Sequence, residues 1–252
     1  MKTHWLFPAL AWLACAIDAA SADEFPVPEN RGAAANELPL PAEQAAAGFK
    51  LPPGCKANVF AAEPDVQNPV AMAWDGKSRL WVAECYTYGD RTTKYDLTLR
   101  DRVLILADTD RDGRADERKV FCDNVQRLMS VEVGLGGVWL ICLPHLLFIP
   151  DRDGDDVPDG APQIVLDGFG ISPENYHNCA NGLRWGPDGW LYGRCGASSP
   201  GRIGPPGSAD EERVPIFGGL WRYHPRAKVF QTLCHGTTQS STPWVLKMVV
   251  TS

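Results

Sequence analysis

One short pattern recurs three times in this chain: a Gly- or Asp-containing turn leads directly into a strand-like run with a large aromatic residue. The copies read DGKSRLWVA, GLGGVWLIC and PDGWLYG. Trp81 and Trp139 are 58 residues apart, and Trp139 and Tyr192 are 53 apart. A turn–strand repeat with a period of about 50 residues is typical of β-propeller blades. We therefore expect an all-β propeller with these three aromatic residues in its core.

The apolar runs between the repeats have the lengths of strands. Each spans four to seven residues and is bounded by Gly, Pro or Asp. No window of ten or more residues has the apolar period of an amphipathic helix. The predicted strands are 79–84, 102–107, 137–143, 146–150, 163–166, 190–194, 219–224 and 228–233. At the observed period, residues 50 to 252 provide about three to four blades.

The first 22 residues have the pattern of a secretory signal peptide. MKTH supplies a basic start, WLFPALAWLACAI is a short apolar run, and Ala20-Ser21-Ala22 fits a small-residue cleavage site. We expect cleavage after Ala22 and a periplasmic or extracellular mature chain with no transmembrane helix. An uncleaved anchor is the alternative, and a lipoprotein attached through Cys15 fits less well because Leu13 is one place too close.

The composition indicates the structure of the segment after the signal peptide and excludes one class of partner. Residues 23–48 are rich in Pro, Ala and Glu, which predicts an extended, partly disordered linker before a domain that begins near Phe49. The formal net charge is −7. Together with the lack of any basic run, this argues against a nucleic-acid partner.

Seven cysteines remain once Cys15 is removed, so at least one has no partner within the chain. The sequence contains no CxxC pair, which argues against a zinc ribbon, and no CxxCH site for covalent haem. Cys179 and Cys195 flank one hairpin-like segment and form the favoured disulfide. Two buried thiols are the alternative.

Two aspartate-rich loops each follow a predicted strand. In residues 106–116 and 149–159, aspartates fall at relative positions 1, 3, 5 and 9. Position 6 is Gly113 in the first loop and Asp156 in the second, where the missing glycine would strain the turn. Alternate carboxylates in a tight turn suit calcium, although neither loop has the Glu of an EF-hand at position 12. We expect structural calcium within the blades; solvated Asp-rich turns are the alternative. The predicted ligands are Asp108, Asp110, Asp112, Asp116, Asp151, Asp153, Asp155 and Asp159.

The segment YHNCANGLRWGPDGWLYG contains the candidate reactive residues. Its GPDG turn by itself indicates only β-structure. His177, Asn181 and Arg184 come just before this turn, where a loop is expected to cross the end of the central channel. A histidine there could remove a hydroxyl proton, and an arginine could hold an anionic group. A structural role is the alternative for His177. Glu84 ends an inner strand and is a further candidate, although a solvated strand end is the favoured reading.

Residues 177–193 resemble the soluble quinoprotein glucose/sorbosone dehydrogenases. The shared pattern is a His followed by Gly-x-Leu-x-Phe-Gly-Pro-Asp-Gly-x-Leu-Tyr, in which this chain has Trp185 in place of the Phe. The resemblance implies a six-bladed propeller that uses pyrroloquinoline quinone and calcium, with His177 as the general base. The family pattern continues into a Gly-Asp pair, whereas this chain reads Gly193-Arg194, so one ligand or cofactor contact differs.

More closely, residues 49–238 resemble the membrane-bound dehydrogenase domain family. The matching stretches include GFKLPPGCKANVFAAEPDVQNPVAMAWDGKSRLWVAE, the two aspartate loops, HNCANGLRWGPDGWLYG, VPIFGGLWRYHP and LCHGTT. This family is exported, and its members are often followed by helical repeats and a c-type cytochrome domain. The resemblance implies oxidation of a sugar or other alcohol, with electrons passed to a cytochrome.

The end of the chain departs from a full six-bladed ring, which needs roughly 300 residues or more at this period. After HGTT the chain reads QSSTPWVLKMVVTS, so residues 239–252 are expected to be a divergent tail left by truncation or a frameshift. Such a chain would be inactive alone, with exposed strand edges. The alternatives to a dehydrogenase are a non-catalytic, calcium-stabilised propeller that binds glycans or proteins, and a lactonase-type propeller with catalytic calcium in its channel.

Overall fold

The structure is a computed structural model that describes residues 39–89, 92–171, 176–196 and 200–236. The predicted signal peptide, most of the predicted linker and the predicted tail at 239–252 lie outside these residues. Strands dominate the described chain, and none of its helices is both long and apolar enough to cross a membrane.

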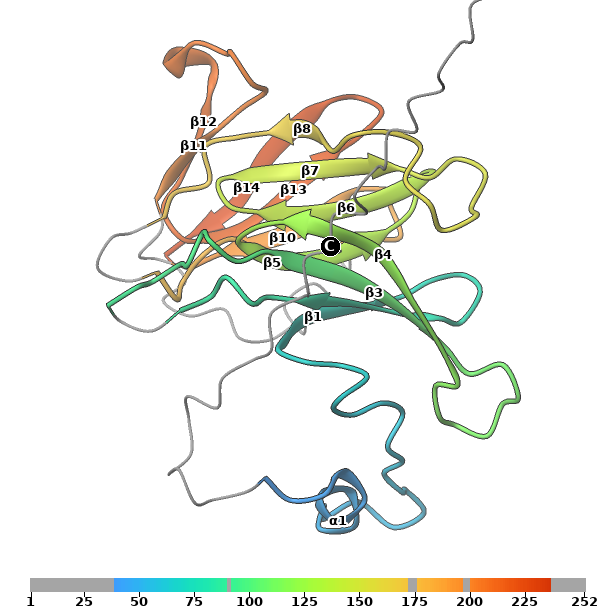
Figure 1. The fold of residues 1–252 in the computed structure, drawn as a ribbon. Coiled ribbons are helices and arrows are strands. Elements are labelled where there is room, and N and C mark those ends of the chain that lie inside the picture. The colour runs from blue at the N-terminus through green and yellow to red at the C-terminus, as the bar shows by residue number, and fades with distance from the viewer. Residues whose placement is uncertain (1–38, 90–91, 172–175, 197–199, 237–252) are drawn as a thin grey trace, which may run out of the picture.

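The strands form three four-stranded antiparallel sheets in the order of a propeller, which confirms the predicted fold class (Figure 1). Blade 1 consists of β1 (Pro69–Trp74), β2 (Leu80–Glu84), β3 (Asp101–Ala107) and β4 (Glu117–Val125). Blade 2 consists of β5 (Leu128–Val133), β6 (Gly137–Cys142), β7 (His145–Pro150) and β8 (Gln163–Leu166). Blade 3 consists of β9 (Asn181–Trp185), β10 (Leu191–Cys195), β13 (Gly219–His224) and β14 (Val229–His235).

Blade 3 carries an insertion between its second and third strands. A hairpin of β11 (Gly201–Ile203) and β12 (Val214–Ile216) projects from the sheet, with the short 3-10 helix η1 (Asp210–Glu212) between the two strands (Figure 1). The isolated bridge between Asp167 and Gly204 ties this hairpin to the end of blade 2.

The repeated aromatic residues are buried, as predicted. Trp81, Trp139 and Tyr192 are 1%, 4% and 1% exposed. Each lies on the second strand of its blade, and their first-strand partners are Ala73, Glu132 and Arg184 respectively. The sequence repeat therefore marks equivalent register positions in three successive blades.

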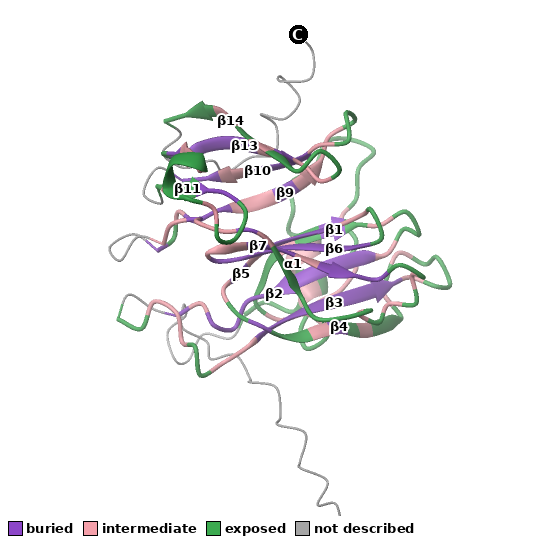
Figure 2. Ribbon diagram, turned by 90° about the horizontal axis from the view of Figure 1, so that it is seen from above, coloured by how far each residue is buried: buried purple, intermediate pink, exposed green. Residues whose placement is uncertain are grey.

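The core lies between the blades because side chains alternate across each sheet. In blade 2, Val138 and Leu140 pack toward blade 1, whereas Trp139 and Ile141 pack toward blade 3. The outer face of blade 1 is covered by the segment before β1, through contacts of Phe60 and Val66 with the cluster around Leu104. Figure 2 shows the middle strands buried, while α1 and much of β4 and β14 are exposed.

The linker prediction was wrong over its last residues. Ala42–Ala47 forms helix α1, not an extended tether. The segment AEQAAA has high helix propensity, and Glu43 in the first turn favours the positive end of the helix dipole. Glu43 also forms an ion pair with Arg114, so the helix is linked to the first aspartate loop.

Candidate functional site

A cavity of about 370 Å³ lies where the first strands of the three blades approach one another. Blade 1 contributes Val70 and Met72, and blade 2 contributes Met129 and Ser130. Two segments outside the blades, which carry Tyr88 and His177, complete the wall together with blade 3. The blade 3 lining residues are Asn181, Gly182, Leu183, Arg184, Gly193, Arg194 and Leu220.

His177 lies at this cavity next to a cluster of tyrosines. The ring of Tyr176 is 4.0 Å from the His177 ring, and the Tyr88 ring is 5.7 Å from it. Tyr88 Oη and His177 Nδ1 are hydrogen bonded. Burial raises the pKa of Tyr88 to about 12, so its phenol remains neutral. The imidazole is thus oriented through Nδ1, while the His177 side chain stays exposed.

The long connection between β2 and β3 builds this cluster. Tyr88 and Tyr95 form an isolated β-bridge within it, and Tyr95 Oη donates a hydrogen bond to Tyr176 O at 3.3 Å. Asp101 anchors the connection because its carboxylate accepts hydrogen bonds from the backbone of Tyr86, Thr87 and Leu128 at 2.7–2.9 Å. Burial raises the pKa of Asp101, and these hydrogen bonds oppose that shift. One carboxylate therefore fixes the site-forming loop to the first strand of blade 2.

Asn181 and Arg184 line the cavity from strand β9, not from the loop that the sequence predicted. Arg184 crosses between blades: its Nη1 lies 3.2 Å from Glu132 Oε2, and its Nη2 donates to Met72 O at 2.8 Å. Glu132 is 5% exposed, and burial raises its pKa while Arg184 opposes that shift. Arg184 thus holds the inner strands of all three blades together at the cavity wall.

Glu84 is not a solvated strand end, so the favoured sequence reading was wrong. It is 0% exposed and forms an ion pair with Arg102. Its carboxylate also accepts hydrogen bonds from Gln67 N at 2.5 Å and Tyr86 Oη at 3.2 Å. Glu84 does not line the cavity that contains His177. Its position indicates a structural role beneath the β2–β3 connection.

The aspartate loops lie at the other end of the strands. The loops follow the C-terminal ends of β3 and β7, whereas the cavity lies near the N-terminal ends of β3 and β5. In each loop, three carboxylates have oxygens within 4.8 Å of one another: Asp108, Asp110 and Asp112 in the first, and Asp151, Asp153 and Asp155 in the second. This spacing fits a hard cation with oxygen ligands.

The fourth predicted aspartate of each loop has a different contact. Asp116 accepts hydrogen bonds from Thr109 N at 2.9 Å and Thr109 Oγ1 at 2.6 Å. Asp159 accepts one from Arg152 N at 2.7 Å. Both side chains therefore close the start of the loop onto its end, and neither belongs to the three-carboxylate groups.

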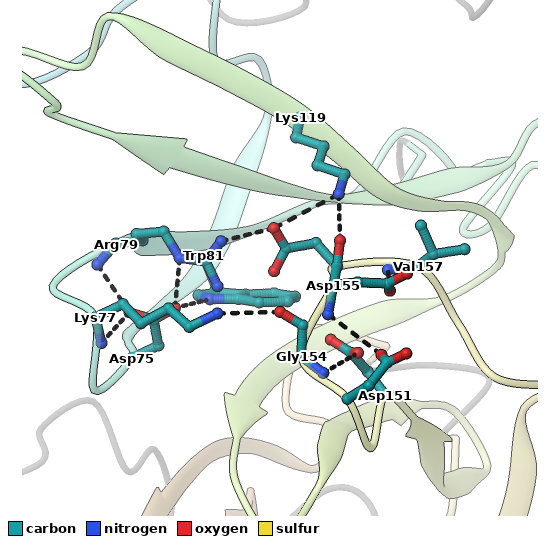
Figure 3. A network of polar contacts seen from close by, with 11 residues as sticks. Asp75, Lys77, Arg79, Trp81, Lys119, Asp151, Gly154, Asp155 and Val157 are labelled. Atoms are coloured by element: carbon teal, nitrogen blue, oxygen red, sulfur yellow. Dashed lines mark hydrogen bonds and ion pairs between the residues drawn. The ribbon is translucent and has the colours of Figure 1, made fainter.

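The two loops have positive φ at the same two positions despite their different glycine positions. Positions 4 and 6 have positive φ in both: Arg111 (65°) and Gly113 (93°) in the first, Gly154 (70°) and Asp156 (69°) in the second. Each loop thus has one non-glycine residue in the left-handed region, Arg111 in the first and Asp156 in the second, so the strain predicted for the second loop alone does not distinguish the two. Three blade 1 side chains hold this loop, because Lys77, Arg79 and Lys119 all contact it (Figure 3).

The favoured disulfide is absent. None of the seven cysteines in the described chain forms a disulfide, and Cys179 and Cys195 are buried thiols. The Cys179 thiol donates a hydrogen bond to Tyr176 O at 2.9 Å. Burial raises the pKa of Cys195 to about 12. Both side chains belong to the core between blades 2 and 3.

Sequence reasoning missed Tyr88 and Arg194 as lining residues. Tyr88 comes from a connection with no recognisable motif. Arg194 was visible only as the departure from the Gly-Asp pair of the quinoprotein pattern. Its Nε donates a hydrogen bond to Asn181 Oδ1.

A family model described as a domain of unknown function (DUF7133) matches residues 41–248, which is most of the chain. The chain belongs to this family. The match begins at the residue before α1 and includes all three blades. A comparison with curated proteins found no match.

Proposed function

We propose that this chain is a dehydrogenase-type propeller domain in which His177 removes the hydroxyl proton of a sugar or other alcohol. The single observation that carries the proposal is the position of His177. It lies at a cavity shared by three blades, with Nδ1 hydrogen bonded to Tyr88. Propeller proteins commonly bind their ligands at such convergent positions.

Tyr88 determines which nitrogen of His177 could act. When Nδ1 carries the hydrogen and donates it to Tyr88 Oη, Nε2 keeps its lone pair and can accept a proton. The hydroxyl proton would move to Nε2 as the C–O bond of the alcohol gains double-bond character. The hydride on the same carbon must leave with its electron pair, so the reaction needs an acceptor.

Pyrroloquinoline quinone is the acceptor that the family resemblance implies, and when bound it would take up the hydride. The cavity has the chemistry to hold a flat conjugated group. Val70, Met72 and Met129 provide apolar and polarisable surface, and Tyr88 adds an aromatic ring. The electrons would then pass to a c-type cytochrome partner.

We propose calcium as a structural ion at the two three-carboxylate groups. Their oxygens converge within 4.8 Å, and they lie in loops at the strand ends away from the cavity. This separation disfavours the lactonase alternative, because that reaction needs calcium in the channel. In the part of the chain that the structure describes, no group of three potential metal ligands lines the cavity.

The domain boundaries and location are part of the same proposal. We assign residues 1–22 to a signal peptide, 23–48 to a linker and 49–238 to the propeller part, so that the mature chain would be exported. Because the family match starts at residue 41, we shift the start of the propeller part from residue 49 to residue 41, so that it includes α1.

The proposal is tested by dye reduction with a panel of sugars and alcohols, after a version of the protein extended to a full ring of blades has been incubated with pyrroloquinoline quinone and calcium. Dye reduction that requires both the quinone and a particular alcohol is the expected result. Tyr88→Phe should lower kcat about 10-fold with little change in KM, because the ring of His177 loses its hydrogen-bond partner. Quinone binding without any turnover would favour the alternative, a calcium-stabilised propeller that binds glycans or proteins.

A further inference from the structure

We propose that the ligand of this cavity carries a carboxylate and that Arg194 binds it, so that the substrate is a sugar acid and not a neutral sugar. This inference deepens the proposed function and rests on it for the identity of the reacting group. The two arginines that line the cavity, Arg184 and Arg194, have different surroundings.

Arg184 already has an anionic partner. Its Nη1 lies 3.2 Å from Glu132 Oε2, and its Nη2 donates to the backbone carbonyl of Met72 at 2.8 Å. The Glu132 side chain is 7% exposed, so the pair is well shielded from water. Glu132 therefore neutralises the charge of Arg184, and the contacts of Arg184 join the three blades.

Arg194 has no anionic partner in the described part of the chain. Its one hydrogen bond there runs from Nε to Asn181 Oδ1, which is a neutral acceptor. Partial burial lowers the pKa of Arg194, as expected for a desolvated cation without a carboxylate beside it. Within the described residues its terminal nitrogens have no hydrogen-bond partner and are not fully buried, and the Arg194 residue lines the cavity.

The backbone is shaped around this guanidinium. Gly182 has a φ of 69°, and a Cβ at this position would lie 2.9 Å from Arg194 Nε. A side chain at residue 182 would therefore push the guanidinium away from Asn181. With Nε held, the two Nη groups remain as a planar pair of donors, which is the geometry that binds a carboxylate through both oxygens.

Arg194 and His177 line the same cavity, so one bound molecule could contact both side chains. A sugar acid could place its carboxylate at Arg194 and one of its hydroxyl groups near His177. A neutral sugar would fill the same space but leave the cation desolvated. A ligand that makes a hydrogen bond to a charged group binds about 10- to 100-fold more tightly than one that lacks it, so the sugar acid should bind more tightly than the neutral sugar by this factor.

The test is calorimetric titration of the full chain with glucuronate and galacturonate, and with glucose and galactose as their neutral counterparts. We expect the acids to bind at least 10-fold more tightly, and Arg194→Gln to remove this difference. Arg202→Gln is the matched control, because Arg202 lies in β11, outside the cavity, and pairs with Asp210. Near-ultraviolet circular dichroism verifies the fold of each variant.

Equal binding of acids and neutral sugars by the wild-type chain would overturn the inference, and so would a preference that persists in Arg194→Gln. A third result would also overturn the inference: the sugar acids fail to bind, and Arg194→Gln abolishes binding of the quinone. In that case Arg194 would bind the carboxylates of the quinone and not those of a substrate. The titration requires no turnover. Tight, Arg194-dependent binding of sugar acids without dye reduction would therefore refute the proposed function and leave the carboxylate site intact.

Discussion

Arg79 in the first turn of blade 1 and Asp156 in the second aspartate loop form an ion pair, with Arg79 Nη1 2.7 Å from Asp156 Oδ2. Lys119 Nζ lies 3.5 Å from the same oxygen. Lys119 also donates to Asp155 O at 2.6 Å, and Lys77 donates to Gly154 O at 3.0 Å. Blade 1 thus holds the loop of blade 2 with three cationic side chains (Figure 3).

Replacing Asp156 with Asn should destabilise the protein at neutral pH by about 1–2 kcal/mol, because a charge-assisted hydrogen bond is lost. Asn tolerates the left-handed backbone, so the substitution isolates the charge. The hydrogen bond from Arg79 lowers the pKa of Asp156. Its stabilising effect is therefore complete above the unfolded-state pKa near 4 and is lost as the pH falls through the lower folded-state pKa. Urea unfolding at pH 7 and pH 3 measures this, and a difference as large at pH 3 as at pH 7 would contradict it.

Calcium should raise the melting temperature. An ion that binds only the folded state at 100 times its Kd stabilises it by about 2.7 kcal/mol. For a domain of this size, that corresponds to roughly 5–10 °C. Asp110→Asn and Asp153→Asn each remove one member of a three-carboxylate group and should each reduce the rise. Thermal melts with calcium or with a chelator are the measurement, and magnesium is the control ion. An unchanged melting temperature in the wild-type chain would contradict calcium binding.

Breaking the buried Glu84–Arg102 pair on one side only should cost about 3–5 kcal/mol. Both side chains are nearly inaccessible, and Arg102→Met would leave the carboxylate of Glu84 without its cation. The double variant Glu84→Gln with Arg102→Met should cost less than Arg102→Met alone, because no unpaired charge remains. Denaturant unfolding of the single and double variants provides the comparison. Additive losses would show that the two residues do not interact in the folded protein.

The cysteines should divide into two reactive and five protected thiols in the described chain. Cys55 and Cys234 are exposed. Burial raises the pKa of Cys85 and of Cys122 to about 12, which suppresses their thiolates. A thiol reagent should therefore label Cys55 and Cys234 quickly, and the other five only after unfolding. Peptide mass spectrometry identifies the sites, and a disulfide between Cys179 and Cys195 would contradict the structure.

Much of the fold could be predicted from the sequence, since all eight predicted strands form. The strands that were missed are the outer strand β4, the inner strands β1, β5 and β9, and the inserted hairpin of β11 and β12. β4 reads ERKVFCDNV and is exposed along most of its length, so it lacks a clear apolar pattern. In β1, Val70, Met72 and Trp74 are apolar but exposed, the reverse of the usual burial pattern.

The candidate site was only partly predictable. His177, Asn181 and Arg184 belong to one recognisable stretch, and they do line one cavity. Tyr88 reaches His177 only because the β2–β3 connection folds over the end of three packed blades, a long-range relationship that leaves no local pattern. The burial of Glu84 also depends on long-range contacts, because Gln67 and Arg102 come from other segments and both contact its carboxylate.

The most direct test of the account compares the wild-type sequence with His177→Ala in the quinone- and calcium-dependent dye assay, each within a version of the protein extended to a full ring of blades. The account predicts dye reduction by the wild-type chain and a loss of at least 100-fold in kcat for the variant. The melting temperature should fall only slightly, because the His177 side chain is exposed. Equal dye reduction by the two proteins, or none by a wild-type chain that is folded and has bound the quinone, would contradict the assignment of His177 as the base.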